Sequence, residues 1–373
     1  MKYSKNEIIN HIEKIRKEIG HKESQINIKD LLFNDEKNEL WIVTLDRPDK
    51  SAIIGKGGWV VGNLKENLNL NKIHVESYSD FLVKKYQLEL SLNTLKSFIS
   101  PNNNFNKNKN NHFNENNNLN KNKKIIPLDN LKVLLENKIN NIYNFDLNSY
   151  LNETNTIESD DNQAIVALSG GVDSSFSLIL AKYLGFNPIA ITVDPGTIIL
   201  PNQFKHNINK LCNKLKVPHQ YIKVDYEDII QNSLKGKFHP CGRCSKNTEE
   251  TIFKFAANNN IDIVIFGDML STGTQCITMN DVSIENDKKP SKSIARLNLP
   301  ATLSIGKEEI KSIVNSYELI SIKGFGCPLL YEVHKNYSHT KKFSIQRILR
   351  ETRSGALEPG EALDLIWSFY KLK

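Results

Sequence analysis

A short apolar run that breaks into a serine and two glycines is the feature that most constrains how this chain can fold. Ala164–Leu168 is long enough to form a buried parallel strand, and a helical pattern resumes at Ser174. Between them, Gly170 and Gly171 let the backbone approach a ligand closely. A strand, a tight turn and a helix N-terminus bring unpaired N–H groups and the positive end of the helix dipole together. The stretch therefore predicts an anion site, with Asp173 placed to cap the helix or to help hold a magnesium ion.

The turn also carries a motif with the pattern S-G-G-x-D-S. Its residues are Ser169, Gly170, Gly171, Val172, Asp173 and Ser174. In a strand–turn–helix context this pattern resembles the PP-loop of the N-type ATP pyrophosphatases, which split ATP into AMP and pyrophosphate while adenylating a substrate oxygen. The spacing is not that of a Walker-type loop. The resemblance implies that these six residues bind the phosphates of ATP with Mg²⁺ and that Asp173 is catalytic; an ordinary βα turn of small residues is the alternative.

Strand-like and helix-like stretches alternate from Gln163 onward. We expect strands at Ala164–Leu168, Asn187–Val193, Gln220–Val224 and Ile261–Phe266, and helices at Ser174–Leu184, Asn202–Leu215 and Lys246–Asn259. This alternation predicts an α/β fold with a doubly wound parallel sheet, which binds ligand at the carboxyl ends of its strands. The resemblance implies the PP-loop version of that fold, which is adenine nucleotide alpha hydrolase-like. Val193 and Gly267 end two of the strands, so we expect both at the nucleotide site, with adenine resting on Val193.

Three cysteines lie in tight turns downstream of the loop. Cys241 and Cys244 form a C-x-x-C that enters a helix, and Cys327 stands in a Gly/Pro turn. Thiolates at helix starts are good ligands for soft metals. By itself the pattern allows a zinc site, a redox dithiol or part of an iron–sulfur site. A structural zinc normally needs four ligands, and Cys212 or His239 is able to complete the set, although Cys212 lies in the apolar phase of a predicted helix.

Three cysteines within one PP-loop domain resemble the tRNA 2-thiolation enzymes, the 2-thiocytidine and 2-thiouridine synthetases, over roughly residues 160–330. The resemblance implies a [4Fe–4S] cluster on Cys241, Cys244 and Cys327, which makes these residues catalytic; Zn²⁺ is the alternative metal. It also implies tRNA as a partner and an external sulfur donor, since no rhodanese-like domain is visible. Two features depart from the family. Gly267–Thr272 lacks the G-H-x-x-D-D pattern, and the usual N-terminal zinc finger is absent, which leaves the substrate base open.

The N-terminal part predicts a small α+β module. Helices are expected at 3–18 and 79–98, and strands at 39–45 and 72–76, with two helices around a glycine-rich turn between the strands. That turn consists of Gly55, Lys56, Gly57 and Gly58. Together with its flanking pattern it resembles the G-x-x-G loop of KH domains, most closely the module of ribosomal protein S3 and its relatives. The resemblance implies that the turn binds single-stranded RNA, with Lys56 on a phosphate; a glycine-rich corner between helices is the alternative.

The sequence divides into five segments. They are a KH-like RNA-binding domain (1–100), an Asn/Lys-rich linker (101–126), a helical connector (127–160), the PP-loop domain (161–335) and a basic C-terminal helical segment (336–373). The linker is expected to be disordered because it has too little apolar surface to offset its ordering entropy. In the last segment, Arg347 and Arg350 are expected to contact the RNA backbone.

Net charge, cysteine count and the length of apolar runs limit the class of protein to which this chain can belong. The net charge of +7 is compatible with a polyanionic partner. Five cysteines, an odd number, argue against a disulfide framework, and no apolar run reaches the length of a membrane span. No apolar signal region is visible at the N-terminus. We therefore expect a soluble cytoplasmic protein with no membrane partner.

Three functions compete. The first is an ATP-dependent tRNA sulfurtransferase that adenylates a base carbonyl and replaces its oxygen with sulfur. The second is a PP-loop amide- or lysidine-type ligase acting on tRNA or a small molecule, which leaves the three cysteines unexplained. The third is a non-catalytic, nucleotide-sensing RNA-binding protein, which tRNA-stimulated pyrophosphate release distinguishes from both enzymes. The sulfurtransferase accounts for the most features.

Overall fold

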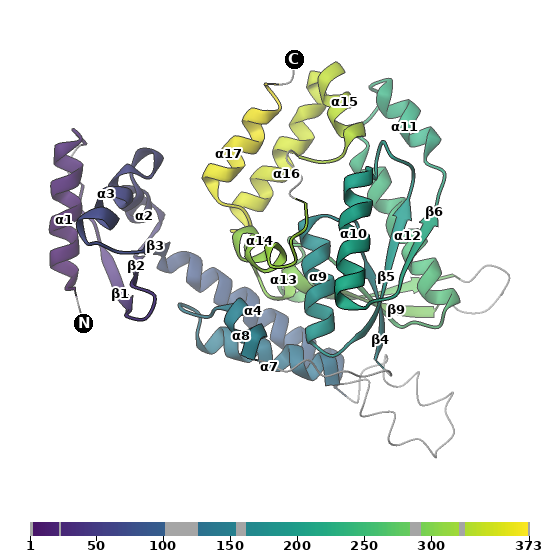
Figure 1. Cartoon of the computed structure of the whole chain (residues 1–373), viewed down its shortest axis with the longest axis horizontal. Helices are drawn as coiled ribbons and strands as arrows, with labels where there is room; N and C mark the ends of the chain where they lie inside the picture. The colour runs from purple at the N-terminus through teal and green to yellow at the C-terminus, as the bar shows by residue number, and fades with distance from the viewer. Residues whose placement is uncertain are drawn as a thin grey trace. The chain divides into compact units, whose positions relative to one another are not determined.

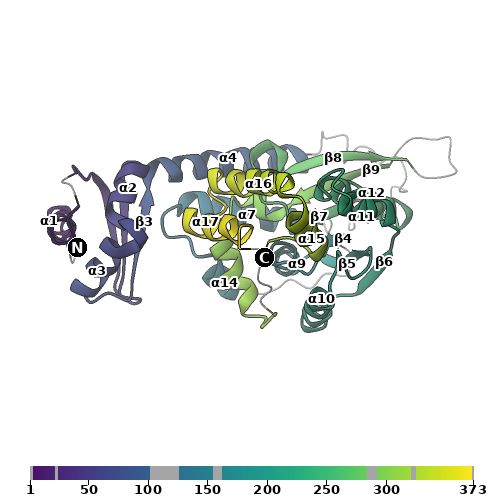
Figure 2. The ribbon, with the colours of Figure 1, turned by 90° about the horizontal axis from the view of Figure 1, so that it is seen from above.

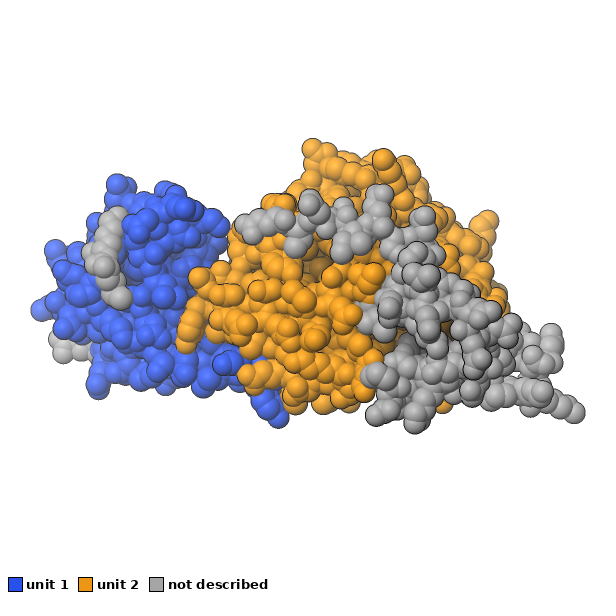
Figure 3. All heavy atoms as spheres, turned by 90° about the horizontal axis from the view of Figure 1, so that it is seen from below, with its two compact units in different colours: residues 1–86 blue, residues 87–373 orange. Residues whose placement is uncertain are grey.

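The computed structural model describes residues 3–21, 24–100, 126–153, 162–283, 292–320 and 325–371. The chain forms two compact units, Met1–Tyr86 and Gln87–Lys373, which Figure 3 distinguishes by colour. The expected linker 101–126 lies outside the described residues, apart from Ile126. The boundary between the units falls inside a long helix, whereas the sequence placed the end of the first domain at residue 100.

The first unit packs helices against a three-stranded sheet. In chain order its elements are α1 (Lys5–Glu18), β1 (Ile28–Asn34), β2 (Glu39–Thr44), α2 (Arg47–Ile54), η1 (Lys56–Gly58), α3 (Trp59–Asn67), β3 (Lys72–Ser77) and the first part of α4 (Tyr78–Ile99). The strand order is β1-β2-β3, with β1 antiparallel and β3 parallel to β2. One core joins the helices to the sheet, and it includes Ile12 of α1, Ile42 of β2 and Leu64 of α3.

Local signals explain most of these elements. Ser4 caps α1 in a capping box with Glu7, and the Asp46 side chain accepts a hydrogen bond from the Asp49 N–H at the start of α2. The predicted helices and strands of this unit are all present. The sequence missed β1, because its exposure does not alternate strictly along the strand.

The second unit is built on a six-stranded sheet in the order β6-β5-β4-β7-β9-β8. Figure 1 labels β4, β5, β6 and β9, and Figure 2 labels β7 and β8 as well. The strands are β4 (Gln163–Ala167), β5 (Asn187–Asp194), β6 (His219–Lys223), β7 (Ile263–Phe266), β8 (Ile277–Val282) and β9 (Lys292–Asn298). All neighbours are parallel except β8, which is an antiparallel edge strand beside β9. The predicted doubly wound α/β sheet is confirmed. Its last two strands were not predicted.

Helices cover both faces of this sheet. Ala164 and Val166 of β4 pack with α9 (Val172–Tyr183), whereas Ile165 between them packs with α12 (Cys241–Asn258). Figure 2 shows α12 on the opposite side of the strands from α9 and α10 (Asn202–Leu215). Because successive side chains of a strand point to opposite faces, an unbroken apolar strand requires two helical layers.

The remaining helices complete this unit. They are α7 (Ile126–Asn140), α8 (Leu147–Glu153), α11 (Glu227–Leu234), α13 (Leu299–Thr302), α14 (Lys307–Asn315), α15 (Pro328–Asn336), α16 (Lys341–Arg353) and α17 (Pro359–Ser368), with short 3₁₀ turns η2 (Gly273–Gln275) and η3 (Ser338–Thr340). The expected connector is part of the main core, since Leu131 and Leu135 of α7 are buried with α9. Within the described ranges, no helix is both long and apolar enough to cross a bilayer.

Candidate active site

The S-G-G-x-D-S turn joins β4 to α9, with Gly171 as the helix N-cap. The hydroxyl of Ser174 donates a hydrogen bond to the carbonyl of Gly171 at 3.0 Å, and the N–H of Ser169 donates to Ser174 Oγ at 3.2 Å. The two hydroxyl oxygens of Ser169 and Ser174 are 3.0 Å apart. These bonds hold the turn folded around the N-terminus of α9, whose first N–H groups have no partner within the helix. The predicted strand–turn–helix is therefore present, and ATP binding by its residues stays a prediction.

Two positions near the loop must be glycine, because a side chain at either one would clash with neighbouring backbone atoms. Gly170 has φ of 76°, and a Cβ there would lie 2.7 Å from the carbonyl oxygen of Phe204 on α10. Gly267 follows β7, and a Cβ there would lie 2.8 Å from the backbone nitrogen of Ser174. Real Cβ atoms do not approach that closely. Gly267, expected at the nucleotide site, thus lets the end of β7 pack directly against the loop.

A lysine that the sequence gave no reason to select faces the loop. Lys307 begins α14, and its ammonium nitrogen lies 3.4 Å from Asp173 Oδ2 and 3.4 Å from Glu351 Oε2 of α16. Glu351 is almost fully buried and also accepts a hydrogen bond from Arg347 Nε at 3.1 Å. Two helices far along the chain therefore deliver a cation and a carboxylate to the start of α9.

The protonation of this group is set by competing effects. Burial raises the pKa of Asp173, and the positive charge of Lys307 partly opposes that shift. Burial by itself would lower the pKa of Lys307, but the carboxylates of Asp173 and Glu351 together raise it above its ordinary value. Lys307 is therefore held as a cation beside the S-G-G-x-D-S turn, which suits the binding of a polyanion.

The three predicted cysteines meet at two helix N-termini. Cys241 and Cys244 lie in the first turn of α12, and Cys327 is the N-cap residue of α15. Cys244 and Cys327 pack against the same apolar cluster, which includes Leu329 and Val333 of α15. The cysteines are partly buried and form no disulfide. Cys244 and Cys327 are more than 80 positions apart in sequence. They become neighbours because α15 packs against α11.

The thiols affect one another electrostatically. Burial raises the pKa of Cys241 to about 12, with further contributions from Cys327 and Cys244 that Arg347 opposes. Burial and Cys327 raise the pKa of Cys244 to about 11. Burial also raises the pKa of Cys327, against the backbone N–H groups that begin α15. Three neighbouring thiols of this kind become thiolates when a cation compensates their charge, so the donor set fits a soft metal in its chemistry.

The thiols are neighbours without being a formed coordination set. Among the residues that the structure describes, no group of three or more His, Cys, Asp or Glu side chains is arranged to hold a metal ion. The two proposed fourth ligands lie elsewhere or are engaged. Cys212 is buried in the main core, and His239 Nε2 lies 3.1 Å from the hydroxyl of Ser344 on α16. Metal binding by Cys241, Cys244 and Cys327 therefore stays a prediction.

Arg347 connects the two halves of the site. Burial raises the pKa of both Asp173 at the loop and Cys241 at the cysteine site, and the positive charge of Arg347 opposes part of each rise. Its guanidinium also lies 5.8 Å from the ring centroid of Phe325. The side chain remains half exposed, while Arg350 is exposed on the same helix. The RNA contacts of both arginines stay predictions. The charge of Arg347 also acts on the loop and on the cysteines, which the sequence alone did not indicate.

The carboxyl ends of β4 and β5 are held by polar contacts. Thr192 donates a hydrogen bond to the carbonyl of Leu168 at 2.7 Å, which ties β5 to the residue before the loop. Asp194 pairs with Lys205 of α10 at 2.6 Å and accepts a bond from the Gly196 N–H. Val193 is partly buried and packs against two apolar clusters. Its side chain lies in a suitable apolar setting, and its contact with adenine stays a prediction.

In the first unit, the glycine-rich turn has the predicted helix–turn–helix form. Gly55, Gly57 and Gly58 all have positive φ, and Gly55 has no room for a side chain because its Cβ would lie 2.3 Å from Val60 Cγ2. Lys56 is exposed, and Trp59 after it is 65% exposed. The turn is thus built to present its backbone and one lysine to solvent. The KH assignment and RNA binding stay predictions.

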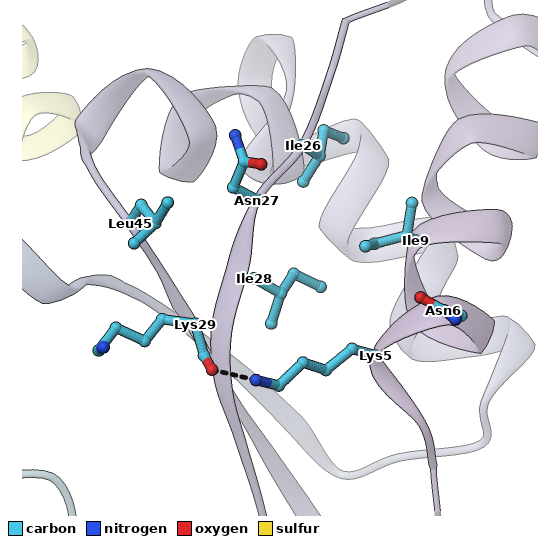
Figure 4. Close-up of a pocket in the computed structure, with 8 residues that line it drawn as sticks. All are labelled: Lys5, Asn6, Ile9, Ile26, Asn27, Ile28, Lys29 and Leu45. Atoms are coloured by element: carbon cyan, nitrogen blue, oxygen red, sulfur yellow. Dashed lines mark hydrogen bonds between the residues drawn. The ribbon is translucent and has the colours of Figure 1, made fainter.

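The first unit also has a hollow of about 380 Å³ beside its edge strand β1 (Figure 4). Lys5 reaches from α1 and donates a hydrogen bond to the backbone carbonyl of Lys29, and both polar and apolar side chains line the hollow. The lining residues are Lys5, Asn6, Ile9, Ile26, Asn27, Ile28, Lys29 and Leu45. None of them belongs to the predicted sites, so the hollow has no part in the chemistry described above.

Comparison with known proteins finds a matching family model for part of the second unit. Residues 163–284 match the model of the family described as "Queuosine biosynthesis protein QueC". The chain is 34% identical to the uncharacterized protein MJ1638 of Methanocaldococcus jannaschii over 201 residues, which span 53% of this chain and 71% of that protein. It is 23% identical to the tRNA-specific 2-thiouridylase MnmA of Bradyrhizobium sp. (strain ORS 278) over 237 residues, 55% of this chain and 57% of that protein.

Among solved structures, the U34-tRNA thiolase NcsA from Methanococcus maripaludis with its [4Fe–4S] cluster is similar with a TM-score of 0.32 and 17% identity, over 60% of this chain and 77% of that one. The chain spans little more than half the length of the 2-thiouridylase that it matches. The MJ1638 match, by contrast, extends over most of that protein. The chain belongs to the family of the uncharacterized protein MJ1638 and is a member of the PP-loop superfamily.

Proposed function

We propose that this protein is an ATP-dependent tRNA sulfurtransferase. One observation supports it above the others: the PP-loop and the cysteine site lie within electrostatic range of the same guanidinium, that of Arg347. An activating site and a sulfur site must act on one substrate atom in turn, so they must share a crevice. The similarity to a tRNA-specific 2-thiouridylase supports tRNA as the substrate.

The loop accounts for the activation step. In this proposal the phosphates of ATP would lie against the N-terminus of α9 and the hydroxyls of Ser169 and Ser174, and Asp173 would help to hold Mg²⁺. A carbonyl oxygen of the base attacks the α-phosphorus, an O–P bond forms, and the bond to pyrophosphate breaks. Lys307 supplies positive charge where negative charge develops on the departing pyrophosphate. Gly267 keeps the loop in place by close packing.

The cysteines account for the second step. Sulfur adds at the activated carbon, and AMP leaves with the former carbonyl oxygen, so that one C–O bond is exchanged for a C–S bond. The sulfur comes from an external donor, either sulfide or a sulfur carrier. A [4Fe–4S] cluster bound by Cys241, Cys244 and Cys327 supplies a place for that sulfide when present; Zn²⁺ or a cysteine persulfide are the alternatives. Without activation, oxide is too poor a leaving group to be displaced.

Thionucleoside analysis tests this proposal. Bulk tRNA from cells lacking the gene is digested and its nucleosides are separated by mass spectrometry, alongside tRNA from cells complemented with wild type or with Cys327→Ala. The proposal expects one thionucleoside to disappear, to return with wild type and to stay absent with the variant. An unchanged set of thionucleosides would overturn it.

A second candidate is an amide- or lysidine-type ligase, which joins nitrogen to an activated carbon. The match to the family described as "Queuosine biosynthesis protein QueC" favours considering a reaction other than thiolation. The same loop serves both reactions, because both need an adenylate. Labelled donors distinguish them. With tRNA, ATP and ³⁵S-sulfide the sulfurtransferase labels the nucleic acid, whereas the ligase incorporates ¹⁵N-ammonium into its product and no sulfur.

A further inference from the structure

The C-terminal helix α16 places an aromatic ring beside the cysteine site. The ring of Phe343 lies 5.6 Å, centroid to centroid, from that of His239, which is two residues before Cys241. Phe343 is nevertheless 46% exposed. The buried face of α16 consists of Ser344, Ile348 and Glu351, so Phe343 stands at the border of that face with much of its ring in solvent.

The surroundings of this ring are cationic. The ammonium of Lys342 lies 5.0 Å from the centroid of the Phe343 ring, and Lys341 lies 5.4 Å from that of Tyr370. Arg347 follows Phe343 by one helical turn, and its Nε donates a hydrogen bond to the Glu351 carboxylate at 3.1 Å. Helix α16 has five basic residues and one acidic residue, and the acidic one, Glu351, is buried and paired. The solvent-facing side of the helix therefore offers positive charge around an exposed aromatic ring.

We infer that Phe343 stacks on an unpaired base of the RNA substrate and that Lys342 and Arg347 contact the phosphates beside it. This inference rests on the proposed function, since it assigns part of the substrate to the same site. An aromatic ring accepts the face of any base, and positive charge next to it suits the sugar–phosphate backbone. The charge distinguishes an RNA from an apolar protein partner, which would leave these cations desolvated. Stacking here holds a target base, or its neighbour, next to the cysteines.

Four variants of the full-length protein test the inference, each with an unmodified tRNA transcript as the probe. They are Phe343→Ala, Phe343→Trp, Phe343→Leu and the control Leu349→Ala, which removes a side chain of similar exposure from another side of the same helix. The Kd for the transcript is measured by fluorescence anisotropy, and the KM values for tRNA and ATP come from pyrophosphate release. Thermal unfolding reports on folding.

If Phe343 stacks on a base, Phe343→Ala and Phe343→Leu are each expected to weaken tRNA binding by about tenfold, whereas Phe343→Trp is expected to bind tRNA as the wild type does. The KM for ATP and the control variant stay unchanged. Restoration by leucine, or equal losses in Phe343→Ala and Leu349→Ala, would show that the ring only packs, and would overturn the inference. If the Phe343 variants bind tRNA more weakly but the wild-type protein makes no thionucleoside, the inference is supported and the proposed function is contradicted. A wild-type protein that does not bind the transcript removes both.

Discussion

The ammonium of Lys307 lies 3.4 Å from the carboxylate of Asp173, although the two residues are 134 positions apart in the chain. One belongs to α14 and the other to the first turn of α9. Their contact puts a fixed positive charge at the point where the motif places the phosphates of ATP. It also means that a residue of α14, far from the motif in sequence, lies beside the predicted nucleotide site.

Replacing Lys307 by methionine is expected to slow tRNA-stimulated pyrophosphate release by about 10²–10³-fold, because a cation that stabilises the transition state is lost. Lys311→Met is the matched control, since Lys311 lies on the same helix and pairs with the more distant Glu361. Steady-state rates at saturating ATP measure the effect. Equal rates for the two variants would show that Lys307 does not act at the phosphates.

Gly170→Ala is expected to lower the free energy of unfolding by about 1–2 kcal/mol or more, because a left-handed backbone and a contact with Phe204 both oppose the added carbon. Gly171→Ala is the control, with φ of −79° and only an ordinary contact at 3.4 Å. Urea denaturation of both proteins gives the comparison. A Gly170 variant as stable as the Gly171 variant contradicts the geometry of the turn.

Cys327→Ser is expected to reduce bound metal and to abolish thiolation while pyrophosphate release continues, because the loop does not contain the cysteine. Metal analysis of anaerobically purified protein, together with its absorbance at about 400 nm, measures the loss of bound metal. Cys212→Ala is the control, since Cys212 is buried in the main core away from the other thiols. Full metal content in Cys327→Ser is the result that excludes a three-cysteine site.

The free energy of unfolding is expected to rise with pH between about 4 and 6.5, because burial lowers the pKa of His334 to about 4, with smaller contributions from His239 and Lys341. The unfolded chain binds a proton on this histidine within that range and the folded chain does not, so raising the pH favours folding. The effect is on the order of 3 kcal/mol at most. Denaturation at several pH values is compared with His334→Gln, whose pH dependence should be shallower. An identical slope contradicts this assignment.

Lys56→Ala is expected to weaken tRNA binding without changing stability, because Lys56 is exposed in the glycine-rich turn. Loss of one phosphate contact reduces the slope of log Kd against log salt by about one. Lys65→Ala removes an equally exposed charge from α3 and serves as the control. If both variants give the wild-type slope, the turn does not hold the RNA backbone.

Much of the fold followed from local patterns. The strand at Ala164–Leu168, the helix after it and the two helices around Gly55–Gly58 are each specified by a few adjacent residues, so the sequence predicted them well. The strands β8 and β9 were missed, because an edge hairpin with partly exposed positions lacks a clear apolar period. Likewise, nothing local indicated that the Leu residues of α7 join the core around α9.

By itself the sequence predicted the strand–turn–helix at Ser169–Ser174 and singled out three cysteines, because glycines, small hydroxyls and thiols at fixed spacings are local patterns. Only the tertiary structure decided which charges surround them. Lys307 and Glu351 look like ordinary solvated residues in their own helices, and Arg347 was expected only as an RNA contact. They lie beside the loop because α14 packs against α9 and Glu351 of α16 pairs with Lys307 of α14. Such docking depends on packing between elements rather than on any pattern within one.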